Sequence, residues 1–280
     1  MEDKIKKILG EMSIEEKIAQ LSCVEGGTLV DNEIFSKQKA CDVLKNGAGH
    51  ISPILRPYDP SNGTKIANEI QKIATSTGPK VPVIIHDECL HGCMAKGSTS
   101  FPQAIGLASS WDPDMVEKIA QIIGKETRVR GIHQALSPTI NIARDARHGR
   151  VEETYGEDPY LTSLMAVAFI KGLQSQKVIA TPKHFAADFA GDGGRDSSAT
   201  FFSERILREV FFPAFKASIQ QAKAWSLMAA YNSINGIPSS SNKWLLTDVL
   251  RKEWGFNGFV VSDYGSVWGI YGNHRVADSL

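Results

Sequence analysis

Short apolar segments alternate with amphipathic segments along most of the chain. The apolar segments predict strands at residues 49–55, 81–86, 135–143, 177–182, 225–231 and 258–261. The amphipathic segments predict helices at residues 61–74, 114–131 and 158–176, and after Ser203 and Asn242. Because apolar strands alternate with helices, the pattern indicates a mostly parallel sheet that is covered on both faces.

Helix-start signals support several of these helices. Ser13 and Glu16 form a capping-box pattern ahead of a helix near the N-terminus. Asp112 and Asp158 are each followed by proline, which is the order expected for an N-cap and the first helical position. Pro213 should kink the helix in which it lies, because proline cannot donate a backbone hydrogen bond.

Two α/β folds agree with the right-handed rule for crossovers between parallel strands: a barrel and a doubly wound sheet. The six predicted strands are fewer than the eight of a closed (β/α) barrel. A barrel would therefore have irregular strands or an incomplete C-terminus. The length of 280 residues fits one large domain of either kind.

Charge and hydropathy exclude some classes of partner. Lys and Arg number 31, and Asp and Glu also number 31, so the formal net charge is zero. Such a chain has no basic field to attract nucleic acid or anionic lipid. No apolar run is long enough to span a bilayer, and the charged N-terminus does not read as a signal peptide. The sequence therefore predicts a cytoplasmic protein.

The sequence predicts no metal and no cofactor. Cys89 and Cys93 lack the second pair that a zinc site needs, so the four cysteines are expected to be free thiols. His86 and His91 are five residues apart, which is poor spacing for a helical metal pair. A glycine-rich turn of the phosphate-binding type is also missing.

Four predicted strands end in ionisable or hydrogen-bonding side chains. These pairs are Asp87-Glu88, Lys183-His184, Tyr231-Asn232 and Asp263-Tyr264. In parallel α/β folds, ligands bind at the edge formed by the carboxyl ends of the strands. The pairs are therefore expected to form one polar cleft. For any single position, the alternative is a cap for the following helix.

Three loops, at residues 88–113, 143–161 and 185–201, are long for a compact domain, and such loops are usually functional. They are rich in carboxylate, guanidinium and amide groups, which suit a ligand covered in hydroxyl groups. The alternative is a solvated surface with salt bridges. That alternative explains many of the individual charges, Asp145 and Glu157 among them.

Five motifs occur in the order found in glycoside hydrolase family 3: FPQAIGLASSWDPDM, RDARHGRVEETYGEDPYL, TPKHF, MAAYNSINGIP and FVVSDYGSV. The chain resembles this family from about residue 10 to its end. The resemblance implies a (β/α)8 TIM-like barrel that is irregular or incomplete at the C-terminus. It implies that residues 1–280 form a single N-terminal catalytic domain, without the family's usual C-terminal α/β sandwich domain.

The resemblance also implies a retaining double displacement on terminal β-D-glucosyl or β-D-xylosyl residues of oligosaccharides or of aryl and alkyl glycosides. Asp263 would be the nucleophile. The sugar-binding residues would be Asp87, Arg150, Lys183, His184, Met228 and Tyr231. Trp268 or Tyr264 would stack on a face of the sugar or, alternatively, belong to the core.

The acid/base residue is left unassigned. The family usually takes it from a second domain, and one subgroup takes it from a His-Asp pair in the loop after the KHF motif. Here that loop has no histidine. Glu88, Asp192 and Asp196 are candidates by residue type alone, and ordinary loop residues are the alternative. A complementary C-terminal domain or chain is therefore an expected partner.

Two other functions remain open at this point. The chain could be a non-catalytic sugar-binding fragment or one chain of a split glycosidase, because the acid/base domain is missing. It could also be a Schiff-base lyase, because Lys183 lies beside a histidine at a strand end and could be activated there.

Overall fold

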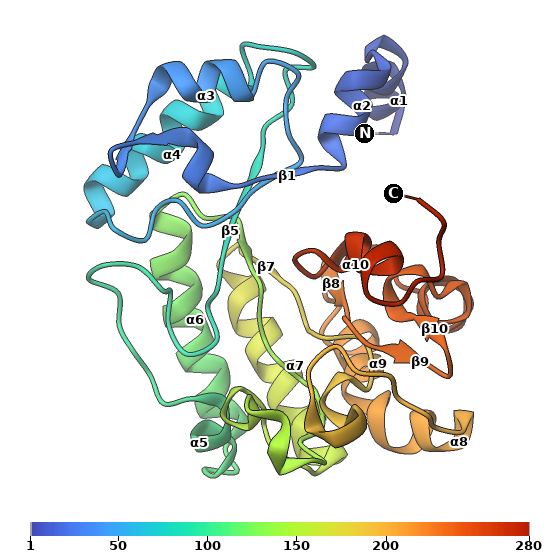
Figure 1. Ribbon diagram of the computed structural model, residues 1–280. Helices are drawn as coiled ribbons and strands as arrows, with labels where there is room; N and C mark the ends of the chain where they lie inside the picture. Colours follow the sequence, from blue (N-terminus) through green and yellow to red (C-terminus); the bar gives the residue numbers. More distant parts are fainter. Residues whose placement is uncertain (1, 280) are drawn as a thin grey trace. The chain divides into compact units, whose positions relative to one another are not determined.

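The computed structural model describes residues 2–279, which divide into two compact units. Unit 1 comprises residues 2–88, 93–99 and 126–135. Unit 2 comprises residues 89–92, 100–125 and 136–279. Each unit contains both helices and strands, coloured by sequence in Figure 1. One helix, α6 (Pro113–Val129), contributes residues to both units.

Unit 1 contains a parallel sheet in the order β1-β4-β5-β6. Its strands are β1 (Cys23–Val24), β4 (His50–Ile51), β5 (Ile84–Asp87) and β6 (Gln134–Ala135). An antiparallel hairpin is formed by β2 (Val30–Asp31) and β3 (Ile34–Phe35). The helices are α1 (Glu2–Glu11), α2 (Ile14–Gln20), α3 (Lys37–Val43) and α4 (Pro60–Ala74), with the 3-10 turn η1 (Gly26–Leu29).

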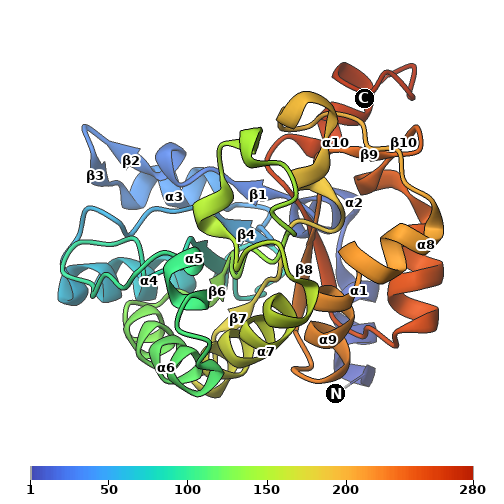
Figure 2. The same cartoon turned by 90° about the horizontal axis from the view of Figure 1, so that it is seen from below.

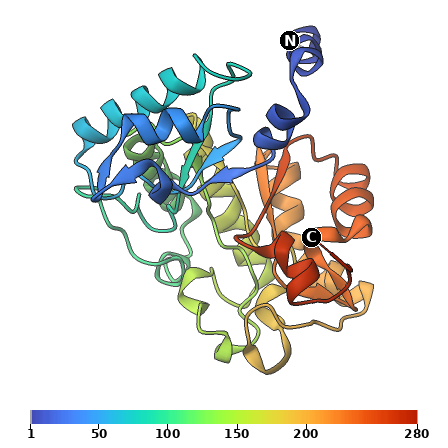
Figure 3. The ribbon, with the colours of Figure 1, turned by 45° about the horizontal axis from the view of Figure 1, so that its top comes forward.

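The core of unit 1 lies under α3 and α4, which pack on each other (Figure 3). Its largest fully buried aliphatic side chains are Leu29, Leu44, Ile51, Leu55 and Ile70. Ile51 comes from a central strand and Ile70 from α4, so helix and sheet share one apolar interior.

Unit 2 has three strands in parallel alignment. They are β7 (Ile179–Ala180), β8 (Ser226–Ala229) and β11 (Phe259–Ser262). A second hairpin is formed by β9 (Ser233–Ile234) and β10 (Ile237–Pro238). The helices are α5 (Ala104–Ala108), α7 (Pro159–Ser175), α8 (Glu204–Ile206), α9 (Pro213–Gln220) and α10 (Ser266–Gly272), with the π-helical segments η6 (Leu207–Phe211) and η8 (Trp244–Glu253).

The parallel strands of unit 2 deliver their carboxyl ends to one edge. Strand β11 pairs with β8 from Phe259 opposite Ser226 to Ser262 opposite Ala229. Beyond β7, parallel bridges join Phe185 to Ala229 and Lys183 to Thr139. Residues 183–185, 229–231 and 262–263 therefore emerge side by side, as expected for parallel strands in an α/β fold.

An aromatic cluster fixes one of these strand ends. The Phe185 ring lies 4.9 Å from that of Phe215, 5.6 Å from that of Trp254 and 5.7 Å from that of Phe212. All four side chains are buried. Such contacts contribute both buried area and favourable ring geometry. The residue that follows His184 is thus part of the core of unit 2, where α7 and α9 also pack together (Figure 2).

The predicted helix starts are confirmed. Ser13 and Glu16 form the reciprocal capping box at α2. Asp112 accepts the N–H of Met115 at 3.0 Å, and Asp158 accepts the N–H of Leu161 at 2.6 Å. These bonds satisfy N–H groups that have no partner inside the first turn of a helix.

Two predicted elements differ in detail. Pro213 does not kink a continuous helix. It begins α9 after the π-helical segment η6, since a proline N–H is not needed in the first turn. The predicted strand at 135–143 has ladder pairing only at its start, in β6. The remaining residues stay extended and join unit 2 through single bonds such as Thr181 N–H to the Ser137 carbonyl.

Within residues 2–279, no helix is long and apolar enough to cross a bilayer. In the described part of the chain, Cys23, Cys41, Cys89 and Cys93 form no disulfide bond.

The Asp158 cap gives a test of stability. We expect Asp158→Ala to lower the free energy of unfolding by about 1 kcal/mol, because the first turn of α7 loses the acceptor for the Leu161 N–H. Denaturant unfolding measures this change. Glu157→Ala is the matched control, since Glu157 is exposed and should change stability by less than about 0.5 kcal/mol. Equal losses in the two variants would contradict the capping role.

Candidate active site

Asp263 lies directly after β11 and is largely buried, with 9% of its side chain exposed. Its Oδ1 accepts the N–H of Tyr264 at 2.8 Å. Gly265 then turns the chain into α10 with a φ of 74°, a conformation that costs glycine little. The strand and the turn together hold this carboxyl group in a fixed orientation.

His184 faces Asp263, with 3.5 Å between its Nε2 and the Asp263 Oδ2. Asn141 holds this histidine through three hydrogen bonds. The Asn141 Oδ1 accepts the His184 backbone N–H at 2.7 Å and contacts the ring Nδ1 at 2.9 Å. The Asn141 amide donates to the His184 carbonyl at 3.0 Å. Because Oδ1 can only accept, Nδ1 must carry a proton.

Arg150 supplies a cation to the same group. Its Nε and Nη2 each donate to Glu153 at 2.9 Å, which is a bidentate pair. The Arg150 Nη2 also lies 3.3 Å from the His184 Nε2. Since a guanidinium can only donate, Nε2 is the acceptor there. This contact and the Asn141 contact specify the same tautomer, a neutral ring protonated at Nδ1.

Burial controls the protonation of both central groups. Burial lowers the pKa of His184 well below its usual range, and the charges of Lys183 and Arg150 lower it further. Burial raises the pKa of Asp263, whereas the Tyr264 N–H and the charges of Lys183 and Arg150 oppose this rise. The histidine therefore stays neutral, and the two cations favour the ionised form of the carboxyl group.

Tyr231 and Met228 belong to the same strand region. The Tyr231 hydroxyl donates to the Tyr264 carbonyl at 2.8 Å and also lies close enough to Asp263 to interact with its carboxyl group. Burial and the nearby Asp263 charge raise the pKa of Tyr231. Met228 is buried on β8 opposite Val261, and its carbonyl accepts the N–H of Phe185.

Asp87 belongs to unit 1, at the end of β5. Its Oδ1 accepts hydrogen bonds from the Arg56 Nε and from the Glu88 N–H, at 2.8 and 2.7 Å. Burial raises the pKa of Asp87, although the Arg56 charge opposes the rise. Of the seven predicted site residues, unit 2 brings together Arg150, Lys183, His184, Met228, Tyr231 and Asp263.

The further candidates from the sequence are exposed or half-buried. Asp192 and Asp196 are exposed, and Glu88, in unit 1, is half-buried. Tyr264 and Trp268 are 52% and 51% exposed, so neither belongs to the core, and both rings are accessible. Asp145 pairs with Arg147, as expected for a surface salt bridge, and this pair lowers the pKa of Asp145 to about 2.

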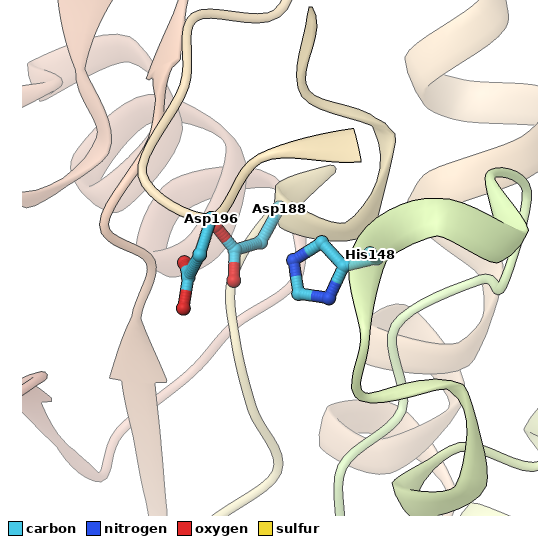
Figure 4. A group of neighbouring side chains, drawn as sticks. All are labelled: His148, Asp188 and Asp196. Carbon is cyan, nitrogen blue, oxygen red and sulfur yellow. The ribbon is translucent and has the colours of Figure 1, made fainter. Parts of the chain in front are cut away.

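Several residues of the site were not predicted from the sequence. Asn141 lies in the predicted strand 135–143, and nothing in the strand pattern indicates its contact with His184. Glu153 was visible only as one charge in an acidic and basic loop. His148 and Asp188 lie on neighbouring loops with Asp196, as Figure 4 shows. Burial, with the nearby Asp196 charge, raises the pKa of Asp188 to about 8.

This arrangement defines a class of site. A buried carboxyl group follows a parallel strand, and cations and a neutral imidazole surround it. In α/β enzymes the carboxyl ends of parallel strands hold the catalytic groups. The chain belongs to the glycosyl hydrolase family 3, because the N-terminal domain of that family matches residues 13–280.

Named relatives agree with this assignment. The chain is 35% identical over its whole length to a putative β-xylosidase of Formosa agariphila, covering 39% of that protein. It is 42% identical over 65% of its length to a β-glucosidase of Rhizobium radiobacter, covering 22% of that protein. The chain thus spans about two-fifths or less of the length of these relatives.

Solved structures confirm the fold. A β-glucosidase from Erythrobacter marinus matches 96% of the chain with a TM-score of 0.90 and 33% identity, over 37% of that structure. A mutant β-glucosidase from Listeria innocua, in complex with laminaribiose, matches 100% of the chain with a TM-score of 0.86 and 30% identity, over 39% of that structure. The predicted α/β, TIM-like barrel architecture is therefore confirmed, with strands as short as two residues.

Proposed function

We propose that this chain carries the nucleophile of a retaining β-glycosidase that removes terminal β-D-glucosyl or β-D-xylosyl residues. The observation that carries the proposal is the buried Asp263 carboxyl group at the end of β11, held by the Tyr264 N–H and faced by His184. The names of the relatives, which include β-glucosidase and β-xylosidase, support the substrate class.

In this mechanism an Asp263 oxygen attacks the anomeric carbon while the bond to the leaving oxygen breaks. The product is a covalent glycosyl ester, which water then hydrolyses with net retention. Lys183 and Arg150 favour the ionised carboxylate that attacks. Neutral His184, whose Nε2 accepts from the Arg150 Nη2 and faces Asp263, would line the sugar site without adding a charge. Arg150, Tyr231 and Met228 would complete the sugar site in unit 2. The sugar-binding role of Asp87, which belongs to unit 1, stays a prediction from the sequence.

The acid/base carboxyl group is proposed to come from a complementary C-terminal domain or chain. The support is that the relatives are much longer than this chain. The second reading, a sugar-binding fragment or half of a split enzyme, rests on the same observation. The cytoplasmic location and the organisation of residues 1–280 as one catalytic domain stay predictions.

The decisive experiment uses dinitrophenyl β-glucoside and β-xyloside, whose leaving groups depart without protonation. We expect release of dinitrophenol and, with a 2-fluoro glycosyl fluoride, one trapped sugar on the peptide that contains Asp263. Peptide mass spectrometry locates it. A label on another residue would refute the nucleophile assignment. Sugar binding without release or labelling, until a C-terminal chain is added, would favour the split-enzyme reading.

The acid limb of the pH profile tests the role of Lys183. Activity needs ionised Asp263 and is lost as the pH falls through its pKa. Lys183 stabilises the carboxylate, so Lys183→Met should raise that pKa and move the acid limb of kcat/KM upward by about 1 pH unit. Lys171→Met, on the exposed face of α7, is the control. If Lys183→Met is slower but the acid limb of its kcat/KM profile does not move, Lys183 contributes to sugar binding and not to the pKa of Asp263.

A further inference from the structure

His148, Asp188 and Asp196 form a side-chain cluster beside the site (Figure 4). One donor atom from each residue lies within 4.8 Å of the others. His148 comes from the 3-10 turn η2 (Ala146–His148), and Asp188 begins η4 (Asp188–Ala190). Asp196 follows η5 (Asp192–Gly194). The proposed glycosidase mechanism uses none of the three side chains.

Two members of the cluster are buried without hydrogen-bond partners. Among the described residues, neither oxygen of Asp188 and neither ring nitrogen of His148 has a partner in hydrogen-bond geometry. The Asn232 N–H lies near Asp188 without reaching that geometry. The Asp188 side chain is fully buried, and His148 is 6% exposed. Buried polar groups normally have partners, because leaving them bare is costly.

The neighbouring arginine does not supply the missing partner. Arg150 directs its two best-placed donors to Glu153, and it reaches Asp196 only at 3.8 Å. The nearest ring nitrogen of His184 is 3.9 Å from Asp188, and that ring is held by Asn141. The cluster therefore offers Asp188 and His148 lone pairs that accept no hydrogen bond, with the Arg150 cation at its edge beside Asp196.

We propose that His148, Asp188 and Asp196 bind one divalent transition-metal ion of the Zn²⁺ type. One imidazole nitrogen and two carboxylate oxygens form a donor set that Zn²⁺ uses in proteins. Three protein ligands leave a fourth position for water on the exposed side, where Asp196 lies. The proposal does not depend on the proposed glycosidase activity.

The three donor atoms need to approach one another only slightly to bind one ion. Donor atoms around a tetrahedral zinc ion are about 3.4 Å apart, given bonds of ~2.0–2.2 Å. The three donor atoms lie within 4.8 Å of one another, so each pair needs to approach by no more than about 1.4 Å. Asp196 has 42% of its side chain exposed and is therefore able to move. The His148 ring is already fixed, because it stacks on Phe189 with 3.8 Å between ring centroids.

The loops that carry the ligands approach each other closely at a glycine. A Cβ on Gly194 would lie 2.6 Å from the Arg147 Cβ, so a larger residue there would push the loops apart. Gly194 also has a φ of 70°, which disfavours other residues. A bound ion would join the His148 loop to the Asp188–Asp196 loop and should raise thermal stability by mass action.

The test measures Zn²⁺ binding by calorimetry, with Co²⁺ absorption as a probe of coordination, after accessible thiols are alkylated. We expect one bound ion per chain and a higher Tm with Zn²⁺. His148→Phe keeps a ring against Phe189 but removes both nitrogens, and Asp196→Asn changes an exposed side chain. Each should weaken binding at least tenfold, roughly, and abolish the Tm increase.

Asp192→Asn is the matched control, because it removes an exposed carboxylate from the same loop outside the cluster. It should bind Zn²⁺ like the parent chain. The absence of binding to the alkylated parent would overturn the proposal. Equal affinities in the parent and in Asp196→Asn would also overturn it, and that variant remains informative even if His148→Phe fails to fold.

Discussion

An Asp263→Gly variant is expected to hydrolyse dinitrophenyl glycosides on the order of 10⁴-fold more slowly than the parent chain. The loss is large because the glycosyl ester can no longer form, whereas the Lys183 and Arg150 cations remain. Removal of the side chain also leaves space next to the anomeric carbon. Initial rates of dinitrophenol release measure the effect.

Added azide should restore much of that rate, because the small anion enters the space left by the carboxyl group. The product should be the α-glycosyl azide, inverted relative to the substrate, since only one displacement occurs. Glu157→Gly, at an exposed loop position, should retain the parent rate and form no α-glycosyl azide. A parent-like rate in Asp263→Gly would disprove the assignment, and a β-glycosyl azide would disprove direct displacement by azide.

Asn141→Ala is expected to lower the free energy of unfolding by about 3 kcal/mol. The change removes three hydrogen bonds, and each buried partner left bare costs about 1–3 kcal/mol before the structure relaxes. The His184 backbone N–H, ring Nδ1 and carbonyl then lose the hydrogen bonds that they form with Asn141. Denaturant titration followed by fluorescence or circular dichroism measures the loss.

Asn257→Ala is the comparison variant, because Asn257 is exposed and should change stability by less than about 0.5 kcal/mol. If both variants unfold at the same denaturant concentration, the Asn141 bonds do not hold the His184 strand end. Asn141→Ala could also lose activity at a temperature where it stays folded. That result would indicate that the His184 tautomer fixed by Asn141 matters for sugar binding.

The main features of the fold and some of the site could be predicted from the sequence. The helical spacing of apolar residues and the capping residues predicted α4, α6 and α7, because a helix is stabilised by contacts between residues close in the chain. The strand-end positions of Lys183, His184 and Asp263 followed from apolar segments that stop at charged residues. The ordered motifs then indicated the family.

The partners of these residues could not be predicted in the same way. Asn141 contacts His184 across 43 positions of the chain, and Arg56 contacts Asp87 across 31. Neither pair has a periodic signal, because each depends on which extended segments become neighbours. The short β1 and the two hairpins were missed for a related reason, since two-residue strands are too brief to show alternation.

The ring of Phe185 packs against Phe212, Phe215 and Trp254. Phe185, the residue next to His184, therefore belongs to the hydrophobic core. The position of His184 and the stability of unit 2 are consequently linked. Substitutions in the exposed loops around Asp192 and Trp268 would leave this aromatic cluster untouched. Repacking of α9 or η8 would instead disturb His184 through its neighbour Phe185.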